Sequence, residues 1–387
     1  MFKKRLKSVQ TPFVIVLAEI LVYAYCVLVG IFVLAWIKTS SAWWLSEAET
    51  TQQKGEKTLS VIIVCRNEIQ NLPYLVADLA QQTLPTKHWE VIFVDDASED
   101  GSYEWLSDKS REVNFCLKVL PNPAEGAISP KKRAIREAIK QAEGEWIVCT
   151  DADCRVPATW LETIFEASHS EVDFISMPVR FMPVPTWFEQ WQAVEFASLV
   201  GSGAACIALG VPTMCNGANI AYRKQAFEQV GGFSGSEHIA SGDDEFLMHK
   251  IANQSTKRVR FLKKSSVIVS TRANPTWQSL LSQRLRWASK WENYQNPFAK
   301  ILAVFVFLVN VSTIFLYPYQ DFLPIALRFL VEFLFLSSIL FFFRQKNLIF
   351  WIPFVFVVYP LYVVFFAIFA RKKSFVWKKR TYNETKQ

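Results

Sequence analysis

The chain has 387 residues, of which 51% are hydrophobic, 15% aromatic and 20% charged. This composition excludes a disordered or fibrous protein, which would carry far fewer large apolar side chains. It also argues against a purely soluble protein, because the excess of apolar residues lies toward the two ends. Residues 41–297 have an ordinary globular composition and are numerous enough for one large domain or two small ones.

The formal net charge of +7 lies in the tails rather than in the centre. Residues 1–8 carry +4 and residues 371–387 carry +6, which leaves −3 for everything between. A nucleic-acid-binding protein concentrates positive charge on its folded domain, whereas cations beside apolar segments are typical of a membrane edge. We therefore expect a lipid bilayer, and no nucleic acid, among the partners. The seven cysteines form no C-x-x-C pair, which favours a reducing compartment over a disulfide framework or a zinc site.

Four apolar runs are candidates for membrane-spanning helices. Residues 13–37 carry one charge, are too long for the apolar part of a signal peptide, and are followed by no A-x-A cleavage site. Residues 323–343 and 347–370 are strong candidates as well. Residues 298–317 contain a lysine and an asparagine, and they leave two alternatives open, a span or a helix that lies in the interface.

Charge does not settle the orientation of the chain in the membrane. One span before the domain places the N-terminal tail on the side opposite the domain, yet both basic tails favour the cytoplasm. If residues 298–317 only lie on the surface, the C-terminal tail and the domain share one side. Within the next apolar run, Arg328 and Glu332 are four residues apart, and we expect them to pair inside the helix bundle rather than face lipid.

The central part alternates short apolar runs with helical patterns. The predicted strands are 59–65, 90–94, 115–120 and 145–150, and the predicted helices between them are 71–82, 102–112 and 130–142. Such alternation is typical of βαβ units with a parallel sheet, and ligands bind such sheets beyond the carboxyl ends of the strands. Neither a G-x-G-x-x-G nor a P-loop pattern is present, so another kind of phosphate site is expected.

Two carboxylates follow the fourth predicted strand, in TDADC at 150–154. Alternate residues of an extended segment point to the same side, so Asp151 and Asp153 can converge. Two carboxylates with open positions for phosphate oxygens suit Mg²⁺ or Mn²⁺, which would neutralise a departing diphosphate. A lone D-x-D also fits an Asx turn after a strand.

Six motifs occur in a characteristic order, and together they span about residues 58–295. They are SVIIVCRNE (60–68), VDDASEDGS (94–102), TDADC (150–154), CNGANIAYRKQAFEQVGGF (215–233), GDDEFL (242–247) and QRLRW (283–287). This series resembles the inverting family 2 glycosyltransferases with the GT-A fold. The last motif is similar to the Q-x-x-R-W pattern of membrane-embedded cellulose, chitin and hyaluronan synthases.

The resemblance implies which residues bind the donor. The residues after the first two strands would seat the nucleotide sugar: Arg66, Asn67, Glu68, Asp95 and Asp96. Asp151 and either Lys131 or Lys132 would also reach the nucleotide or its diphosphate, although a solvated helix face explains the two lysines nearly as well. An Asp-Asp at a strand end can also serve only as a helix cap.

The resemblance also implies the catalytic carboxylates. Asp244 matches the catalytic aspartate of the family, with Asp243 directly before it. A sugar hydroxyl is a poor nucleophile at neutral pH, so a base must take its proton as it attacks the anomeric carbon opposite the leaving diphosphate. The alternative is that both carboxylates only cap a helix over 245–253.

QRLRW lies on a predicted helix over 277–293. Gln283, Arg286 and Trp287 are spaced three and four apart, so one helix face presents all three to the diphosphate or the acceptor. An interfacial belt of Arg and Trp is the alternative. Residues 186–209 either line the acceptor side, as the resemblance implies, or form an ordinary core helix.

We therefore predict an α/β GT-A domain with a mostly parallel sheet, flanked by transmembrane helices. The expected organisation is a tail with one transmembrane helix (1–40), a linker (41–57), the glycosyltransferase domain with interfacial helices (58–297), two or three transmembrane helices (298–370) and a basic tail (371–387). The expected location is the inner cell membrane, multi-pass, with the catalytic domain facing the cytoplasm, because nucleotide sugars are cytoplasmic.

The expected function is transfer of a sugar from a nucleotide-diphosphate donor, a UDP-sugar, to a hydroxyl of a growing polysaccharide or a lipid-linked glycan. QRLRW favours a processive synthase. The small number of spans is few for an export channel and favours either a non-processive enzyme, acting on a polyprenyl phosphate or glycolipid, or a homo-oligomer or export partner. A catalytically degenerate membrane interaction module is the alternative of another class, and the carboxylates at 151, 153 and 244 argue against it.

Overall fold

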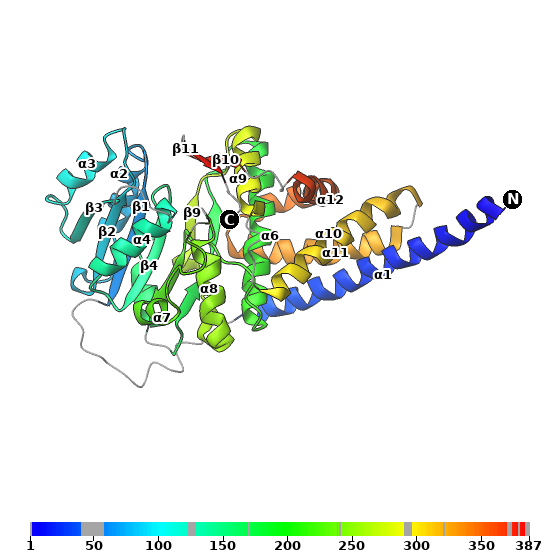
Figure 1. Ribbon diagram of the computed structural model, residues 1–387, viewed down its shortest axis with the longest axis horizontal. Helices are drawn as coiled ribbons and strands as arrows, with labels where there is room; N and C mark the ends of the chain where they lie inside the picture. Colours follow the sequence, from blue (N-terminus) through cyan, green and yellow to red (C-terminus); the bar gives the residue numbers. More distant parts are fainter. Residues whose placement is uncertain are drawn as a thin grey trace.

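The computed structural model describes residues 2–39, 58–122, 129–168, 171–237, 239, 241–289, 296–319, 322–369, 374–377 and 380–383. The predicted linker at 41–57 lies outside the described residues, as do 290–293 of the predicted QRLRW helix and most of the loop at 121–130. Figure 1 shows a sheet domain at one end, a set of long helices at the other, and helix α6 upright between them.

A seven-stranded sheet forms the centre of the domain, in the order β3-β2-β1-β4-β7-β5-β8. The strands are β1 (Leu59–Cys65), β2 (Trp89–Asp95), β3 (Cys116–Pro121), β4 (Trp146–Asp151), β5 (Phe174–Ser176), β7 (Ile220–Arg223) and β8 (Val259–Phe261). The four predicted strands are confirmed to within one residue at each end. Every residue of β2 is buried, as expected for an apolar run covered on both faces.

Strands β1 to β4 are mutually parallel, so their carboxyl ends meet at one edge of the sheet. The register places Cys65 beside Asp95 and Val64 beside Asp151. Strand β7 runs antiparallel between β4 and β5, which makes the sheet mixed rather than wholly parallel. A second, two-stranded sheet pairs β6 (Val179–Phe181) with β9 (Val269–Thr271) in parallel.

Helices cover the sheet and connect its strands. They are α2 (Leu72–Ala80), α3 (Ser102–Lys109), α4 (Pro130–Gln141), α5 (Trp160–Ser168), α7 (Lys224–Gln229) and α8 (Asp243–Gln254), with short 3₁₀ turns at Thr86–His88, Thr256–Arg258 and Ser265–Val267. The three predicted connecting helices are confirmed, each ending one to three residues early. Helix α4 begins at Pro130, whose missing N–H costs nothing in the first helical turn.

Helix α6 (Trp187–Ala208) separates the domain from the long helices. It begins with a capping box, in which the Thr186 hydroxyl accepts from the Glu189 N–H and the Glu189 carboxylate accepts from the Thr186 N–H. Helix α9 (Trp277–Ser289) carries QRLRW. Both helices pack against α12 (Ile352–Phe369), so the site-bearing helix α9 is in contact with the apolar helices.

Four helices of the described chain are long and apolar enough to cross a membrane: Phe13–Lys38 within α1 (Phe2–Lys38), α10 (Pro297–Leu316), α11 (Phe322–Phe342), and Lys346–Ile368, which comprises a 3₁₀ turn (Lys346–Trp351) and most of α12. Helix α10 packs along α1, which favours a span over an interfacial position for 298–317.

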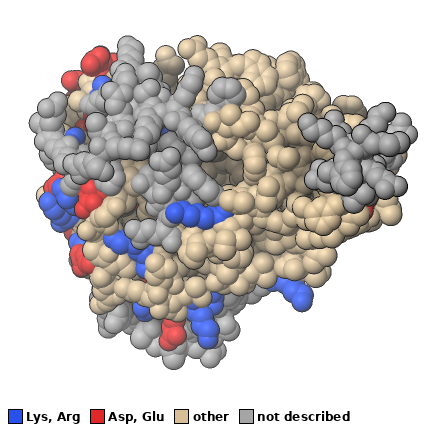
Figure 2. Space-filling view, turned by 45° about the vertical axis from the view of Figure 1, so that its right-hand side comes forward, with Lys and Arg blue, Asp and Glu red and all other residues tan. Residues whose placement is uncertain are grey.

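On the face in Figure 2, charged side chains gather toward the left and lower edges, and a broad area is uncharged.

The predicted pairing of Arg328 with Glu332 is confirmed. The Arg328 Nε donates to the Glu332 Oε1 over 2.9 Å, and the guanidinium is fully buried. Its other nitrogens donate to the Asn310 Oδ1, over 3.0 Å, and to the Thr313 hydroxyl, both on α10. The asparagine that made 298–317 look doubtful as a span is therefore a partner of this buried charge.

The C-terminal segment returns to the domain. Strand β10 (Ser374–Trp377) pairs with β11 (Arg380–Asn383) and contacts α9. The short 3₁₀ turn Tyr317–Tyr319 joins α10 to the α11 region. The described tail strands thus lie beside the domain, whereas Figure 1 shows the N-terminus at the far end of α1.

Candidate active site

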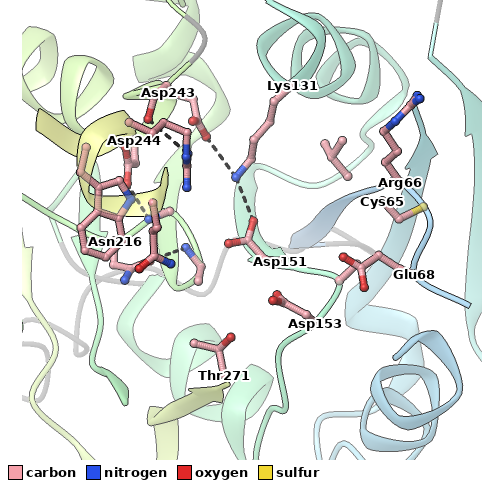
Figure 3. A pocket seen from close by; sticks show the side chains of 18 of the residues that line it. Cys65, Arg66, Glu68, Lys131, Asp151, Asp153, Asn216, Asp243, Asp244 and Thr271 are labelled. Atoms are coloured by element: carbon pink, nitrogen blue, oxygen red, sulfur yellow. Dashed lines mark hydrogen bonds and ion pairs between the residues drawn. The ribbon is translucent and has the colours of Figure 1, made fainter. Parts of the chain in front are cut away.

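A cavity of about 260 Å³ opens at the carboxyl ends of β1 and β4 (Figure 3). Eleven of the residues predicted from the sequence line it: Arg66, Glu68, Asp96, Lys131, Asp151, Asp153, Asp243, Asp244, Gln283, Arg286 and Trp287. They come from the ends of β1, β2 and β4 and from the helices α4, α8 and α9. Sequence segments more than 200 residues apart therefore meet at one site.

Lys131 joins the two acidic motifs (Figure 3). Its Nζ lies 2.8 Å from the Asp151 Oδ1 and 3.6 Å from the Asp243 Oδ2. Burial opposes the charge on this lysine, but the carboxylates of Asp151 and Asp243 outweigh burial and raise the pKa of Lys131 above its usual value. The ammonium group therefore stays charged and neutralises part of the acidic cluster.

Lys132, the alternative to Lys131, points elsewhere. Its side chain is almost completely buried and donates to the Ser236 carbonyl oxygen over 2.5 Å. The ammonium also lies 5.3 Å from the centre of the Phe246 ring. Of the two lysines, Lys131 lines the cavity and Lys132 holds α4 against the segment before α8.

Asp244 stands in the first turn of α8, facing the loop after α6. Its Oδ2 accepts the Gly217 N–H over 2.6 Å, and its Oδ1 accepts the Glu245 N–H over 2.8 Å. A Cβ at position 217 would lie 3.2 Å from the Asp244 Oδ2, so glycine allows this close approach. Two amide donors and the helix N-terminus stabilise the carboxylate as an anion and fix its direction. It is thus both a helix-end residue and a cavity residue.

At the ends of β1 and β2 the polar groups hold one another in place. The Arg66 guanidinium donates to the carbonyl oxygens of Asp96 and Ala97. The Asp96 Oδ1 accepts from the Asn122 Nδ2 over 2.7 Å, and the Glu68 Oε2 accepts from the Asn71 Nδ2 over 2.6 Å. These contacts fix the rim of the cavity on the nucleotide side of the predicted site.

Asn67 and Asp95 are not among the residues that line the cavity, although the resemblance assigned them to nucleotide binding. Asn67 has a φ of 53°, and its side-chain oxygen accepts the Glu99 N–H over 2.8 Å. The Asp95 Oδ2 accepts the Ser98 N–H over 3.0 Å. Both side chains are thus engaged in fixing the loop after β2, and their contact with the donor stays a prediction.

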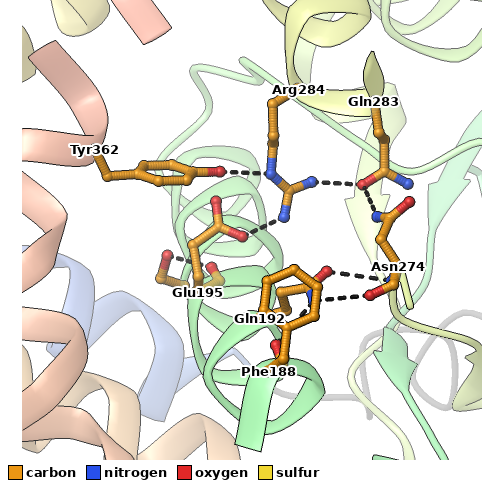
Figure 4. A network of polar contacts seen from close by, with 8 residues as sticks. Phe188, Gln192, Glu195, Asn274, Gln283, Arg284 and Tyr362 are labelled. Carbon is orange, nitrogen blue, oxygen red and sulfur yellow. Dashed lines mark hydrogen bonds and ion pairs between the residues drawn. The ribbon is translucent and has the colours of Figure 1, made fainter. Parts of the chain in front are cut away.

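A buried ion pair anchors the QRLRW helix (Figure 4). The Arg284 guanidinium donates to the Glu195 carboxylate of α6, to the Tyr362 hydroxyl of α12 over 2.7 Å, and to the Gln283 Oε1 over 2.9 Å. The same Gln283 oxygen accepts from the Asn274 Nδ2. Arg284 is 5% exposed and Glu195 is 3% exposed, so this is a desolvated pair.

Sequence reasoning missed this pair because the motif directs attention to Gln283, Arg286 and Trp287. The signal available was a carboxylate, Glu195, in the interior of a largely apolar helix. The Arg284 guanidinium also lies 4.3 Å from the centre of the Trp287 ring, which places the indole at the cavity. The structure therefore separates the motif into three cavity-lining residues and one anchor.

Asp151 and Asp153 fit a divalent cation that also takes oxygens from a ligand. The Asp151 side chain is 40% exposed and both carboxylates line the cavity. Among the described residues no three His, Cys, Asp or Glu side chains gather as a complete metal site. Two hard oxygen donors with open positions are what Mg²⁺ or Mn²⁺ accepts when phosphate oxygens complete its shell.

Comparison with known families agrees with this geometry. The pattern of Glycosyl transferase family 2 matches residues 60–231, and that of Glycosyl transferase family group 2 matches residues 146–369, more than half of the chain. The chain belongs to glycosyl transferase family 2. Together the two matches cover both acidic motifs, QRLRW and the apolar helices that follow it.

Relatives of this family 2 chain match only in part. It is 29% identical over 129 residues to the cholesterol galactosyltransferase of Borreliella burgdorferi, covering 33% of this chain and 34% of that protein. It is 29% identical over 126 residues to the dolichol-phosphate mannosyltransferase of Saccharomyces cerevisiae, covering 32% and 45%. The chain thus matches less than half the length of either relative.

The fold of this family 2 chain is similar to a solved structure. The mannosyltransferase PcManGT from Pyrobaculum calidifontis, in complex with GDP-Man and Mn²⁺, aligns with a TM-score of 0.52 and 18% identity. The alignment covers 89% of this chain and 99% of that one. The likeness confirms the predicted GT-A architecture and extends beyond the sheet domain.

Proposed function

We propose that this chain is a membrane-bound inverting glycosyltransferase that moves a sugar from a nucleotide-diphosphate donor to an acceptor hydroxyl. One observation carries the proposal: the acidic pair after β4, the acidic pair of α8 and the QRLRW helix line a single cavity. Family 2 membership supports it. A degenerate interaction module would not need to keep these groups together around an open cavity.

The chemistry assigns a separate task to each group. Asp244 takes the proton of the acceptor hydroxyl while that oxygen attacks the anomeric carbon. The bond between the anomeric carbon and the diphosphate oxygen breaks in the same displacement, and the nucleoside diphosphate leaves with the electron pair. Attack opposite the leaving group inverts the configuration at the anomeric carbon.

Cationic groups of the cavity oppose the charge of the leaving diphosphate. Arg286 lines the cavity on the α9 side and its guanidinium is 3.5 Å from the Ser241 hydroxyl. Lys131 of α4 also lines the cavity, with its ammonium 2.8 Å from Asp151. A divalent ion held by Asp151 and Asp153 would supply further charge neutralisation when bound. The donor we propose is a UDP-sugar, and the named ligand of PcManGT, GDP-Man, is the main alternative.

The decisive test is turnover by the purified full chain in a detergent without sugar hydroxyls. A panel of UDP- and GDP-sugars is offered with a lipid extract, with Mn²⁺ or with EDTA. Release of the nucleoside diphosphate from one donor, dependent on the lipid extract, supports the proposal. Absence of both binding and turnover with every nucleotide sugar would refute it.

Metal dependence gives the first mutational prediction. Asp153→Ala removes one of two proposed carboxylate ligands, so Mn²⁺ should no longer strengthen UDP binding, whereas the melting temperature should stay close to wild type. Calorimetric titration of UDP with and without Mn²⁺ measures this. Glu104→Ala removes an exposed carboxylate of α3 and serves as the control. Wild-type activity in excess EDTA would contradict the metal assignment.

The acceptor is a hydroxyl of a glycan or of a lipid-linked molecule. QRLRW supports placement in the synthase-like group that carries the Q-x-x-R-W pattern, because Gln283, Arg286 and Trp287 line the cavity. The names of the two relatives refer to cholesterol and to dolichol phosphate, which supports a lipid or lipid-linked acceptor. The described chain has four helices that could span a membrane, which is few for an export channel. An enzyme that exports a polysaccharide would therefore need an oligomer or a partner protein to form the channel.

We further propose that the chain is a multi-pass protein of the inner membrane with its sheet domain in the cytoplasm. Nucleotide sugars are made there, and strand β10 of the tail contacts α9 and so lies beside the domain, which requires that only two of the three apolar helices after the domain cross the membrane. The N-terminal end of α1 would then lie on the opposite side. The basic N-terminal tail would then be the one segment that departs from the rule that positively charged segments stay in the cytoplasm.

The orientation can be measured with single-cysteine labelling. Lys87→Cys, on an exposed 3₁₀ turn of the domain, should react with a membrane-impermeant maleimide only in inside-out vesicles. The native Cys26, Cys116 and Cys215 are replaced by serine, because all three are partly exposed. A tag after residue 387 should share the accessibility of position 87, and a tag before residue 1 should not. Reaction of the introduced cysteine only in right-side-out vesicles would refute the cytoplasmic site.

A further inference from the structure

A second cavity, of about 230 Å³, lies directly behind the first. The two cavities share four lining residues: Phe196, Asn216, Asp244 and Trp287. The rings of Phe196 and Trp287 are 6.3 Å apart and belong to α6 and α9. Asp244 therefore faces the donor cavity from one side and this inner cavity from the other.

The wall of the inner cavity is mainly apolar. Its apolar lining comes from α6, β8 and the segments after β5 and α6, and includes Met177, Leu199, Val200, Ala204, Met214 and Phe261. The two methionines are flexible and can adapt to different apolar shapes. Polar side chains lie among the lining at Ser176, Asn216, Asp244 and Glu245. None of the described lining residues is a lysine or an arginine.

One helix separates the inner cavity from the membrane helices. Helix α6 lines it with Leu199, Val200 and Ala204, and the same helix packs on α1, α11 and α12. The packing against α11 is close, because a Cβ at Gly201 would lie 2.1 Å from the Ile339 Cδ1. Figure 1 shows α6 between the sheet and the ends of the long helices. The inner cavity and the apolar helices therefore lie on either side of one helix.

We propose that the inner cavity receives the apolar body of the acceptor, and that this acceptor is a neutral lipid alcohol whose hydroxyl is presented to Asp244. The proposal rests on the proposed function and names its acceptor class. Burial of hydrocarbon against an apolar wall is favourable, because apolar surface leaves water. The many hydroxyls of a polysaccharide would instead lose their hydrogen bonds to water here and find few polar partners.

The charge around the inner cavity argues against a phosphate headgroup. A lipid phosphate in the inner cavity would lie beside the carboxylates of Asp244 and Glu245, whereas Lys131 and Arg286 line the donor cavity and are not among the described residues that line the inner one. A neutral hydroxyl has no such cost, and it can donate its hydrogen to Asp244 before transfer. The same carboxylate then takes the proton as the bond to the sugar forms.

Cys215 provides a reporter inside the inner cavity. It lines the cavity and is partly exposed, as are Cys26 and Cys116, whereas Cys65, Cys149, Cys154 and Cys206 are buried. In the full chain with Cys26→Ser and Cys116→Ser, in nanodiscs, we measure the rate at which N-ethylmaleimide alkylates Cys215. The probes are farnesol, farnesyl phosphate and a soluble cello-oligosaccharide, each added with and without UDP.

Farnesol should slow alkylation in a saturable manner, farnesyl phosphate should require higher concentrations, and the oligosaccharide should have no effect. In a series of 1-alkanols, we compare the free aqueous concentration that gives half protection, after subtracting the alkanol taken up by the bilayer. This concentration should fall about threefold to fourfold per added methylene until the cavity is full, because transfer of one CH₂ from water contributes ~0.8 kcal/mol. Stronger protection by farnesyl phosphate would overturn the neutral acceptor in favour of a lipid phosphate. Protection by the oligosaccharide alone would overturn it in favour of a glycan.

Filling the cavity supplies the matched control. Val200→Trp, and independently Leu199→Trp, should abolish protection by farnesol, whereas Leu209→Trp at the exposed C-terminal end of α6 should not. UDP binding by each variant reports whether it is folded. Farnesol protection that survives in folded filled variants would refute the proposal. Failure of the wild type to bind any nucleotide would instead refute the proposed function, so the two can be told apart.

Discussion

Asp244→Asn should lower kcat by about 10²–10⁴-fold, the contribution that a general base typically makes. The amide keeps the size of the carboxylate and its oxygen can still accept one backbone N–H, but it cannot accept the acceptor's proton. UDP affinity should change little, because Asp244 is proposed to act on the acceptor hydroxyl. Single-turnover transfer and calorimetric UDP titration measure the two quantities separately.

Arg286→Ala is the contrasting variant, because this guanidinium is proposed to hold the diphosphate. Loss of one charged hydrogen bond, about 1.5–3 kcal/mol, should weaken UDP binding and turnover together. If Asp244→Asn lost UDP binding but kept its rate at saturating donor, the two roles would be exchanged. A variant at 244 unchanged in both measurements would mean that Asp244 only caps α8, which begins at Asp243.

Glu195→Ala should destabilise the chain by about 3–5 kcal/mol, because it leaves the buried charge of Arg284 without its carboxylate. For a domain of this size that corresponds to a melting temperature lower by about 6–20 °C. Thermal unfolding in detergent measures the shift. Glu137→Ala breaks the exposed pair with Lys140 and should cost no more than about 1 kcal/mol.

The double variant Glu195→Leu/Arg284→Met distinguishes loss of the pair from loss of one partner. Replacing both charges by apolar side chains should recover much of the stability, since no buried charge is left uncompensated. If the double variant is stable yet transfers poorly, the pair positions α9, whose Gln283 receives a hydrogen bond from Arg284. A single variant Glu195→Ala as stable as Glu137→Ala would show that the pair contributes little.

Much of the donor half of the site follows from local sequence. Apolar runs such as 59–65 and 145–150 form strands covered on both faces, and parallel strands must end at the same edge of the sheet. The acidic motif at 150–154 therefore had to lie beside the end of β1. The candidate membrane-spanning helices near both ends could also be predicted from the sequence, because a run of about 20 apolar residues is a local property of the chain.

Side-chain partners could not be read from the sequence in the same way. Lys131 and Lys132 are adjacent on one helix, and only the packing of α4 against β4 and α8 decides that Lys131 meets the acidic cluster and Lys132 does not. Asn67 and Asp95 occupy motif positions, but the loop after β2 folds back on them and takes up their hydrogen-bonding groups. Such contacts depend on how elements pack, which local patterns do not encode.

The inner part of the site shows the same division most clearly. Residues 186–209 were predicted either to line the acceptor side or to form an ordinary core helix, and the sequence did not decide between the two. Glu195 and Arg284 are 89 residues apart, and their meeting requires α6, α9 and α12 to pack together first. The apolar cavity behind Asp244 arises from that packing, because its walls come from six separate segments. The sequence by itself thus determined the elements and the chemistry at the strand ends, and the packing of distant helices determined the shape of the acceptor side.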